Sequence, residues 1–305
     1  MKTPSWFLKR NIIAIFLLPF SLVYLLISMF VFKYRSLWQK QSKNPVICIG
    51  NIMAGGVGKT PIVREVAKFL KNSAVVMRGY KGGDEARMLE SSGIKVFTGA
   101  NRKKSILAAE QSGAKYIVMD DGFQNPTIKK DLSIVVFDGL IAGGNKFPLP
   151  AGPLRELVCT GLKRADALII INRQKKDTWD KFGKPVFAAT TKHINPGIRG
   201  KVFAFAGIGY PKKFFNGIGD LFTVVGEKPF PDHYNYTVRD LEQIILDATT
   251  ADADHIVTTE KDWVRLPEKY QEIIDFIPME THIEKGFWTF ISEFIHKPMN
   301  NKHIR

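Results

Sequence analysis

The residues most clearly suited to chemistry lie in a glycine-rich segment that ends with Lys59, Thr60 and Pro61. The segment, residues 50–61, reads GNIMAGGVGKTP. Glycine lets backbone N–H groups converge on phosphate oxygens, because no Cβ atom stands in the way. In such a loop the lysine reaches the β- and γ-phosphates of a nucleotide, and the threonine hydroxyl is a ligand of Mg²⁺. The predicted nucleotide-binding residues are Met53, Ala54, Gly55, Gly56, Val57, Gly58, Lys59 and Thr60.

The elements on either side of this segment favour a phosphate-binding loop over an incidental glycine-rich turn. An apolar, strand-like run precedes it at 46–49, and a helical pattern follows at 61–70. Strand, loop and helix in this order are the context that the loop requires, and the helix N-terminus adds a partial positive charge. One residue departs from the strict pattern G-x-x-x-x-G-K-[ST], because Met53 stands at the position of the first glycine.

A pair of acidic residues, Asp120 and Asp121, follows the apolar run 116–119. Carboxylates at the end of a buried strand, downstream of a phosphate loop, are typical of a Walker B site, where one of them holds Mg²⁺ directly or through water. A plain Asp-Asp-Gly turn is the alternative, and the phosphate loop makes the metal site the favoured interpretation. We therefore predict that Thr60 and one of Asp120 and Asp121 hold the metal ion.

Further charged side chains follow the strand-like runs on the same side of the predicted sheet. Arg78 ends the run 74–77 and leads into a glycine-containing loop that carries Asp84. Arg102 and Arg155 also lie near the carboxyl side, Arg155 at the end of a Pro/Gly-rich loop. Arginines at a phosphoryl-transfer site stabilise negative charge, whereas arginines on an ordinary surface are simply solvated.

The strand-like runs alternate with helical patterns, as in a doubly wound α/β domain with a mainly parallel sheet. Ligands of such folds bind at the carboxyl ends of the strands, where the phosphate loop also lies. The runs are 46–49, 74–77, 116–119, 133–137 and 167–171, and the helical patterns are 61–70, 103–111 and 155–162.

A second, smaller α/β unit is predicted after a linker at 178–196. Its expected elements are strands at 202–205 and 255–257 and a helix that begins after Thr237. His233, beside Asp232, lies just before this helix. A histidine there could orient a catalytic carboxylate, although a lone histidine in a loop is more often inert.

Residues 12–32 form an almost entirely apolar run without a charged side chain. Its length matches the roughly 20 residues that a helix needs to cross the hydrocarbon core. Basic residues flank the run on both sides, with Trp and Tyr near its ends. A cleaved signal peptide is disfavoured, because its apolar region would be shorter. Two interpretations remain: a helix that spans the membrane, and a helix that lies in the interface with its basic flanks on anionic headgroups.

The amino-acid composition narrows the possible class of protein further. The net charge of +15 indicates an anionic partner such as nucleic acid, a phospholipid surface or a phosphorylated substrate. A hydrophobic content of 45% argues against several membrane spans, and two cysteines are too few for a disulfide framework and suit a reducing cytosol. We predict a P-loop NTPase-like α/β fold with a membrane anchor at 1–40, a P-loop core at 41–200 and a smaller unit at 201–305 that closes over the site.

Taken together, the motifs resemble those of the tetraacyldisaccharide 4′-kinases of the lipid A pathway over nearly the whole chain. They are the N-terminal apolar run, G-N-x-x-x-G-G-x-G-K-T-P at 50–61, R-G-Y at 78–80, G-D-E at 83–85, D-D-G-F-Q at 120–124, P-A-G-P-L-R-E at 150–156, F-A-G-I at 205–208, D-H-Y at 232–234 and T-T-E-K-D at 258–262. The loop of that family also lacks the first Walker glycine. This chain departs from the family at Asn125, where His is usual, and at Ala86, where Pro is usual.

The resemblance implies an enzyme that uses ATP and Mg²⁺ to phosphorylate the 4′-hydroxyl of a tetraacyl-disaccharide 1-phosphate, the lipid A precursor. It implies that Asp84 is the catalytic aspartate, that His233 is paired with it, and that Asp120 and Asp121 are metal-site carboxylates. Contacts with substrate or phosphate are predicted at Arg78, Arg102, Gln124, Arg155 and Glu156. The expected partners are this lipid and the membrane, with no nucleic acid and no obligate protein partner. The expected location is the bacterial inner membrane, with the catalytic part on the cytoplasmic face.

A different class of protein has a similar loop. Partitioning and targeting ATPases, which are nucleotide-switched binding modules, also have a Gly-Gly-x-Gly-Lys-Thr sequence, so a membrane-anchored nucleotide switch is the alternative function. Those ATPases typically carry a lysine just before the glycine pair, where this chain has Ala54. A membrane adaptor with an inactive loop is disfavoured, because Lys59, Thr60 and Asp121 are all present.

Overall fold

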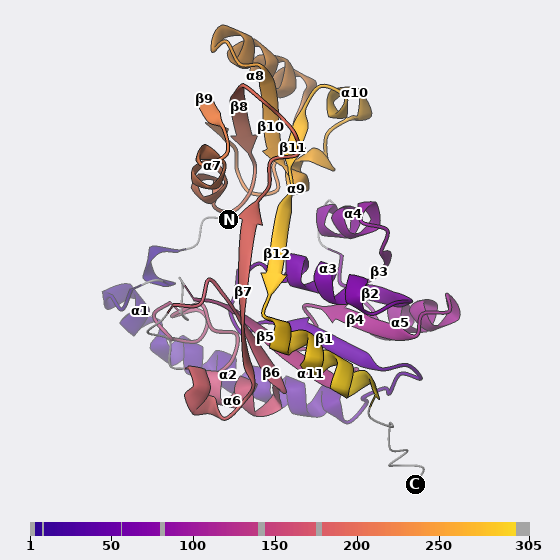
Figure 1. Ribbon diagram of the computed structural model, residues 1–305. Coiled ribbons are helices and arrows are strands. Elements are labelled where there is room, and N and C mark those ends of the chain that lie inside the picture. Colours follow the sequence, from indigo (N-terminus) through magenta and orange to yellow (C-terminus); the bar gives the residue numbers. More distant parts are fainter. Residues whose placement is uncertain are drawn as a thin grey trace.

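We analysed a computed structural model of the chain. It describes residues 4–7, 9–55, 57–79, 83–139, 144–174 and 179–296. Gly56, one of the predicted nucleotide-binding residues, lies outside this range. Two sheets, one larger and one smaller, organise the described part of the chain (Figure 1).

The larger sheet is built on parallel strands and confirms the predicted α/β class. Its order is β12-β7-β6-β5-β1-β4-β2-β3, and among these described strands β12 runs antiparallel to β7. The bounds are β1 (Val46–Gly50), β2 (Ser73–Met77), β3 (Lys95–Thr98), β4 (Tyr116–Asp120), β5 (Leu132–Asp138), β6 (Ala167–Ile171), β7 (Val186–His193) and β12 (Met279–Ile283). The five apolar runs of the sequence correspond to β1, β2, β4, β5 and β6. They are almost entirely buried, as strands covered on both faces require.

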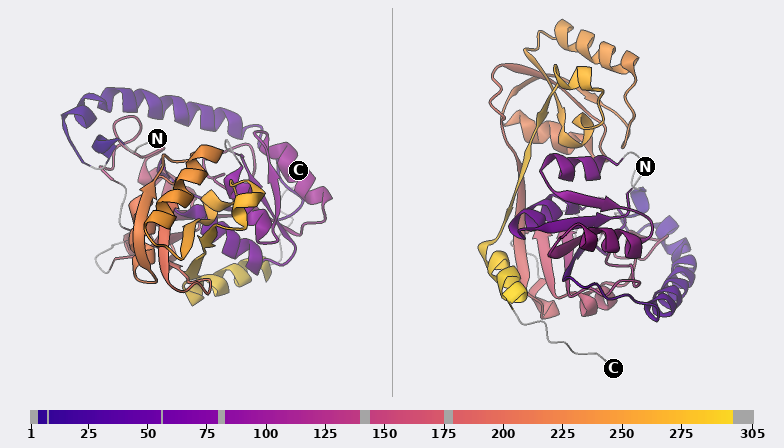
Figure 2. Two further views of the ribbon diagram at one scale, coloured as in Figure 1. Left: turned by 90° about the horizontal axis from the view of Figure 1, so that it is seen from above. Right: turned by 90° about the vertical axis from the view of Figure 1, so that its right-hand side faces the viewer.

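Helices cover both faces of the larger sheet. Figure 2 shows α11 (Lys285–His296) on one side of the sheet and α2 (Leu18–Ser36) on the other. α3 (Lys59–Phe69) packs beside α11 through the rings of Phe69 and Trp288, which are 4.8 Å apart. The remaining helices of this unit are α4 (Asp84–Ser91), α5 (Arg102–Gln111) and α6 (Val158–Arg164). The helix expected at 155–162 begins three residues later, at Val158, and the backbone N–H of Arg155 donates to Ile52.

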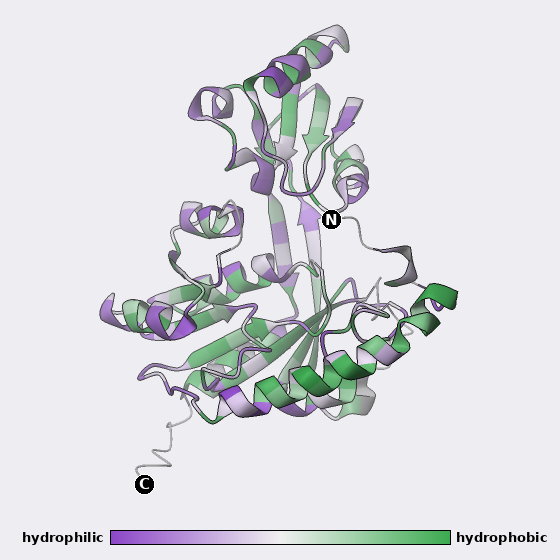
Figure 3. Cartoon of the chain, turned by 180° about the vertical axis from the view of Figure 1, so that it is seen from behind, coloured by the Kyte–Doolittle hydropathy of each residue, from purple (hydrophilic) through white to green (hydrophobic). Residues whose placement is uncertain are grey.

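The N-terminal apolar run forms α1 (Ile12–Phe16) and α2, with Pro19 in the first turn of α2. Proline suits that position because the first helical N–H groups have no partner within the helix. α2 is long and apolar enough to cross a membrane, and it is exposed to solvent along its outer side, as the green helix in Figure 3 shows. It does not project from the body but lies along it.

The smaller sheet has the order β11-β10-β8-β9 among its described strands. The bounds are β8 (Lys201–Ala206), β9 (Thr223–Pro229), β10 (His255–Thr259) and β11 (Asp275–Ile277). Side chains of β8 alternate between two cores: Val202 and Ala204 pack towards α7 (Pro211–Gly219), and Phe203 and Phe205 pack towards α8 (Val238–Thr250). The predicted cap of α8 is present as a capping box, in which Thr237 and Asp240 bond each other's backbone N–H.

Two strands join the sheets, and they change the expected division of the chain. The stretch 178–196, predicted to be a linker, contains β7, whose eight residues pair with β6 and with β12. The range 201–305 was expected to form one unit, but β12 and α11 return to the larger sheet. Figure 1 shows β7 and β12 rising side by side from the larger sheet towards the smaller one.

The smaller unit depends on one fully buried carboxylate, that of Asp262. It accepts hydrogen bonds from the backbone N–H of Gly207 at 3.0 Å, the Tyr236 hydroxyl at 2.9 Å and the Thr259 hydroxyl at 2.6 Å. Arg265 forms an ion pair with it. Removing one member of a buried, paired set leaves the other charge uncompensated.

We predict that Asp262→Ala lowers the free energy of unfolding of the smaller unit by about 3–5 kcal/mol. Denaturant unfolding of the purified protein in detergent, followed by tryptophan fluorescence, measures this loss. Asp220→Ala is the control, because Asp220 is exposed after α7 and its removal should change the value by less than about 0.5 kcal/mol. Equal stability of the two variants would contradict the assignment.

Candidate active site

The phosphate loop connects β1 to α3, as the sequence predicts. Gly58 has a φ of 77° and is the residue before the helix, so that α3 begins at Lys59. Only glycine adopts this left-handed conformation without strain, and a Cβ atom there would also lie 3.1 Å from Ile171. The loop therefore presents Lys59 and Thr60 at the N-terminus of a helix, where backbone N–H groups are free to bind an anion.

The turn after β4 lies directly against the end of β1. A Cβ atom on Gly50 would lie 2.5 Å from the Cβ of Phe123, so a larger residue could not allow this approach. The backbone N–H of Asp121 donates to Ile49 at 3.0 Å, and Asp121 itself has a left-handed φ of 50°. These contacts bring the carboxylate of Asp121 to the phosphate loop, where it lies 3.4 Å from the Lys59 ammonium.

Asp120 and Asp121 differ in their surroundings. Burial raises the pKa of Asp120 to about 7, although the charge of Lys59 opposes this shift. Burial also disfavours ionisation of Asp121, but its ion pairs with Lys59 and Arg155 outweigh that effect and lower its pKa. One oxygen of Asp120 is buried without a hydrogen-bond partner. Asp121 is therefore the ionised carboxylate of the pair, and Asp120 is the one with an oxygen that has no hydrogen-bond partner.

Arg155, Gln124 and Glu156 form a hydrogen-bonded group beside this pair. The Arg155 guanidinium donates to Asp121 at 3.0 Å and to Gln124 at 3.3 Å. The Gln124 amide donates in turn to Glu156 at 3.0 Å and to the backbone of Asn51 at 2.7 Å. The sequence-predicted residues from three separate segments thus meet at one place.

The two remaining arginines differ in position. Arg102 is buried at the start of α5 and donates to the backbone oxygens of Gly99 and Asp120, at 3.2 and 3.3 Å. It therefore supports the acidic turn. Arg78 is exposed at the end of β2, and the structure does not bring it into the group around Asp121.

The two predicted catalytic residues, Asp84 and His233, contact each other across the two units. Asp84 is buried at the start of α4, and its Oδ2 lies 2.9 Å from Nδ1 of His233. His233 has a left-handed φ of 57°, and its side chain is partly exposed. The charge of Glu85, the neighbour of Asp84 in the chain, contributes to the raised pKa of Asp120.

A lysine fixes the proton of this histidine. The ammonium of Lys261 lies 3.1 Å from Nε2 of His233 and can only donate, so Nε2 is the acceptor and the ring proton is on Nδ1. Nδ1–H therefore donates to Asp84. Arg265 adds a second positive charge, 3.7 Å from the same carboxylate oxygen.

Sequence reasoning assigned no role to Lys261 or Arg265. The motif T-T-E-K-D at 258–262 was the available signal, because charged residues there follow β10 at its carboxyl end.

The acidic pair is suited to a magnesium ion bound together with phosphates. Among the described residues no group of three or more His, Cys, Asp or Glu could hold a metal by itself. Mg²⁺ does not require such a group, since it keeps several waters and binds one or two carboxylates plus phosphate oxygens. Asp120, with its partnerless oxygen, Asp121 and the Thr60 hydroxyl meet that requirement.

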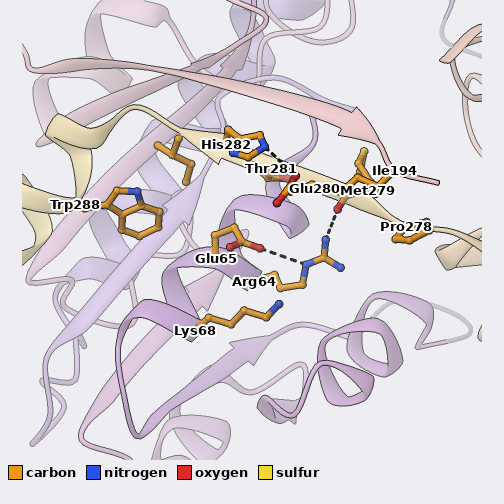
Figure 4. A pocket seen from close by; sticks show the side chains of 11 residues that line it. Arg64, Glu65, Lys68, Ile194, Pro278, Met279, Glu280, Thr281, His282 and Trp288 are labelled. Carbon is orange, nitrogen blue, oxygen red and sulfur yellow. Dashed lines mark hydrogen bonds and ion pairs between the residues drawn. The ribbon is translucent and has the colours of Figure 1, made fainter. Parts of the chain in front are cut away.

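A separate pocket lies between α3, β12 and α11 (Figure 4). Its volume is about 490 Å³, and Arg64, Lys68, Glu280 and Trp288 are among its lining residues. Arg64, on α3, donates to Glu260 at 2.9 Å and to the backbone of Met279 at 2.6 Å. The pocket thus borders the contact that holds the phosphate-loop helix to the smaller unit, and no predicted site residue lines it.

The parallel sheet, the phosphate loop before α3 and the acidic turn after β4 define a P-loop NTPase-like enzyme of the kinase type. The family model for tetraacyldisaccharide-1-P 4′-kinases matches residues 13–296, so the chain belongs to that family.

Curated relatives and a solved structure agree with this assignment. The chain is 39% identical over 265 residues to the tetraacyldisaccharide 4′-kinase of Rhodospirillum rubrum, covering 76% of this chain and 80% of the relative. It is 34% identical to that of Gluconobacter oxydans, with 92% and 93% covered. A crystal structure of LpxK from Aquifex aeolicus in complex with ATP is similar with a TM-score of 0.77 and 26% identity, covering 93% of this chain and 99% of that one.

The raised pKa of Asp120 predicts a pH-dependent cost to stability. The folded protein holds this proton up to about pH 7, whereas the unfolded chain releases it near pH 4, so the carboxyl lowers stability as pH rises between these values. In metal-free protein, Asp120→Asn should therefore be stabilising at pH 8, and its advantage should grow by on the order of 2 kcal/mol between pH 5 and pH 8. Denaturant unfolding in the presence of a chelator tests this, and an advantage that stays constant or shrinks with pH contradicts it.

Proposed function

We infer that this protein transfers the γ-phosphate of ATP to the 4′-hydroxyl of a tetraacyl-disaccharide 1-phosphate, a precursor of lipid A. The observation that carries the proposal is that a chain of this family holds both a phosphate loop paired with its acidic turn and a buried aspartate, Asp84, paired with a histidine. The nucleotide-switch alternative lacks such support, because the carboxylate–histidine pair contributed by the second unit suits proton transfer from an acceptor.

In the proposed reaction Asp84 accepts the proton of the sugar hydroxyl while that oxygen forms its bond to the γ-phosphorus. The bond between the γ-phosphorus and the bridging oxygen breaks, and ADP leaves with the electron pair. The Nδ1–H group of His233 donates a hydrogen bond to Asp84 and keeps its proton, so that it holds the carboxylate in place, and Lys261 keeps the histidine in that tautomer.

The charged groups of the site stabilise the phosphates. Lys59 reaches the β- and γ-phosphates, and Arg155 lies where the transferred group carries negative charge. We assign Thr60, Asp120 and Asp121 as the residues that would hold Mg²⁺. When bound, the ion neutralises phosphate charge and orients the nucleotide. Arg102 supports Asp120 through its backbone, and Gln124 and Glu156 orient Arg155.

The membrane would be bound by α2 lying in the plane of the interface. Its inner side contacts the body from Ser21 to Phe32, about 17 Å at 1.5 Å per residue. A helix held along that length cannot cross the bilayer, because polar loops and charged side chains of the body would enter the hydrocarbon. Its exposed side chains, including Leu22, Leu26 and Phe30, would enter the lipid.

Basic residues at both ends of this helix suit anionic headgroups: Lys9, Arg10, Lys33, Arg35, Lys40 and Lys43. We therefore propose that the protein lies on the cytoplasmic face of the bacterial inner membrane, where ATP is available and where a bilayer-resident acceptor reaches the site without leaving the lipid.

The direct test is an assay with γ-labelled ATP and a tetraacyl-disaccharide 1-phosphate in detergent micelles. Label should move to the lipid, and Lys59→Ala should lower the rate at least about 100-fold, since it removes a charge from the transferred phosphate. Lys68→Ala, an exposed position on the same helix, is the matched control and should keep the wild-type rate. Hydrolysis of ATP without labelled lipid would instead support the nucleotide-switch alternative.

The proton-transfer pair is tested by a double-mutant cycle. Asp84→Asn should lower kcat by about 10²–10⁴-fold with little change in ATP affinity, because it removes the base but not the phosphate contacts. His233→Ala should lose a similar order, and the double variant should be little worse than Asp84→Asn, since the pair acts as a unit. His255→Ala, a partly exposed histidine paired with Asp275, serves as control. Fully additive losses would show that the two residues work independently.

A further inference from the structure

The loop 148–156 lies between the apolar helix α2 and the phosphate loop, and it bonds to both. On the helix side, the Ser21 hydroxyl donates to the backbone of Pro148 at 2.9 Å and accepts from the N–H of Ala151 at 3.0 Å. The Tyr24 hydroxyl donates to the backbone oxygen of Arg155 at 3.2 Å. These contacts join a helix with an exposed apolar side to the backbone of a loop that carries a site residue.

On the other side, the same loop holds the nucleotide segment. The N–H of Ala54 donates to Pro153 at 2.7 Å, and the N–H of Arg155 donates to Ile52 at 2.8 Å. The side chain of Arg155 then pairs with Asp121, which pairs with Lys59. A continuous series of hydrogen bonds and ion pairs therefore runs from the inner side of α2 to the residues that would bind phosphate.

Arg164 forms a second connection between α2 and the site. The guanidinium of Arg164 lies between two rings, 4.4 Å from the centroid of Phe32 on α2 and 4.6 Å from that of Phe123 in the acidic turn. It also pairs with Glu156, which accepts from Gln124. Cation–π contacts of this kind contribute more stabilising free energy where water is partly excluded.

The polar residues on the inner side of α2 are unnecessary for binding lipid. Ser21 is only 2% exposed, and an apolar residue would favour membrane insertion more than a hydroxyl does. The partly or fully buried positions 21, 24, 25, 28, 32 and 36 recur at helical spacing and form one stripe against the body. The two sides of α2 therefore serve different purposes.

We propose that Ser21 and Tyr24 are positioning residues for catalysis, which hold loop 148–156 so that Arg155 meets Asp121 and the phosphate loop keeps its shape. The outer side of α2 binds the membrane, and the inner side is part of the active-site scaffold. This assignment rests on the proposed kinase function. It makes the N-terminal helix an integral part of the folded enzyme rather than a separable anchor.

The experiment compares variants of the two sides in the full-length protein. Tyr24→Phe and Ser21→Ala each remove only a hydroxyl, and Tyr34→Phe, at an exposed position of the same helix, is the matched control. Leu26→Ser and Phe30→Ser alter the outer side. Each protein is assayed for kcat and both KM values in detergent micelles, and for flotation with vesicles of phosphatidylethanolamine and phosphatidylglycerol.

The inner-side variants should lose about three- to tenfold in kcat in micelles, as expected for the loss of the one or two hydrogen bonds that each hydroxyl makes with the loop, while they float as the wild type does. The outer-side variants should lose flotation and keep kcat in micelles. In Arg155→Ala, the further change Tyr24→Phe should have little effect, because the residue that it positions is gone.

Three results would overturn the proposal: wild-type kcat in Tyr24→Phe and Ser21→Ala, losses of kcat that are fully additive with Arg155→Ala, or a loss of flotation in the inner-side variants with kcat unchanged. Failure of the kinase proposal itself is distinguishable, because the wild type and the Tyr34→Phe control would then also transfer no label to lipid.

Discussion

The arrangement of the site depends on the carboxylate of Asp121, which is mostly buried and would be costly to ionise without partners. Lys59 and Arg155 supply two positive charges to the same oxygen, at 3.4 and 3.0 Å. Because these cations belong to α3 and to loop 148–156, compensating one charge fixes three segments relative to each other. Phosphates and a metal ion would join a network that already balances its charge.

The second unit acts through a small number of polar contacts. β7 and β12 connect it to the larger sheet, and the Arg64–Glu260 pair ties it to the helix of the phosphate loop. His233 of the second unit contacts Asp84 at the start of α4. Such contacts can form and break without disrupting either hydrophobic core, because each unit packs its own sheet. An enzyme that must admit a bulky lipid and then exclude water benefits from this division.

The sequence predicted those features whose cause is local. Continuous apolar runs identified five strands of the larger sheet, and glycine, lysine and aspartate at strand ends identified the phosphate loop and acidic turn. β7 was missed because its residues are partly exposed and only weakly periodic, and β12 because it returns to a sheet that the chain left many residues earlier. Lys261 and Arg265 gain their significance from a tertiary contact with the His233–Asp84 pair, which no spacing along the chain encodes.

The N-terminal helix combines two properties that composition alone does not separate. Its length and apolarity satisfy the requirement for a membrane span, and Ser21 and Tyr24 direct hydroxyl groups into the body. On its other side Leu26 and Phe30 are more than half exposed, and exposed apolar side chains gathered on one surface mark a site of interaction. Because the inner hydroxyl groups bond to loop 148–156, which carries Arg155, the position of this helix bears directly on the geometry of the site.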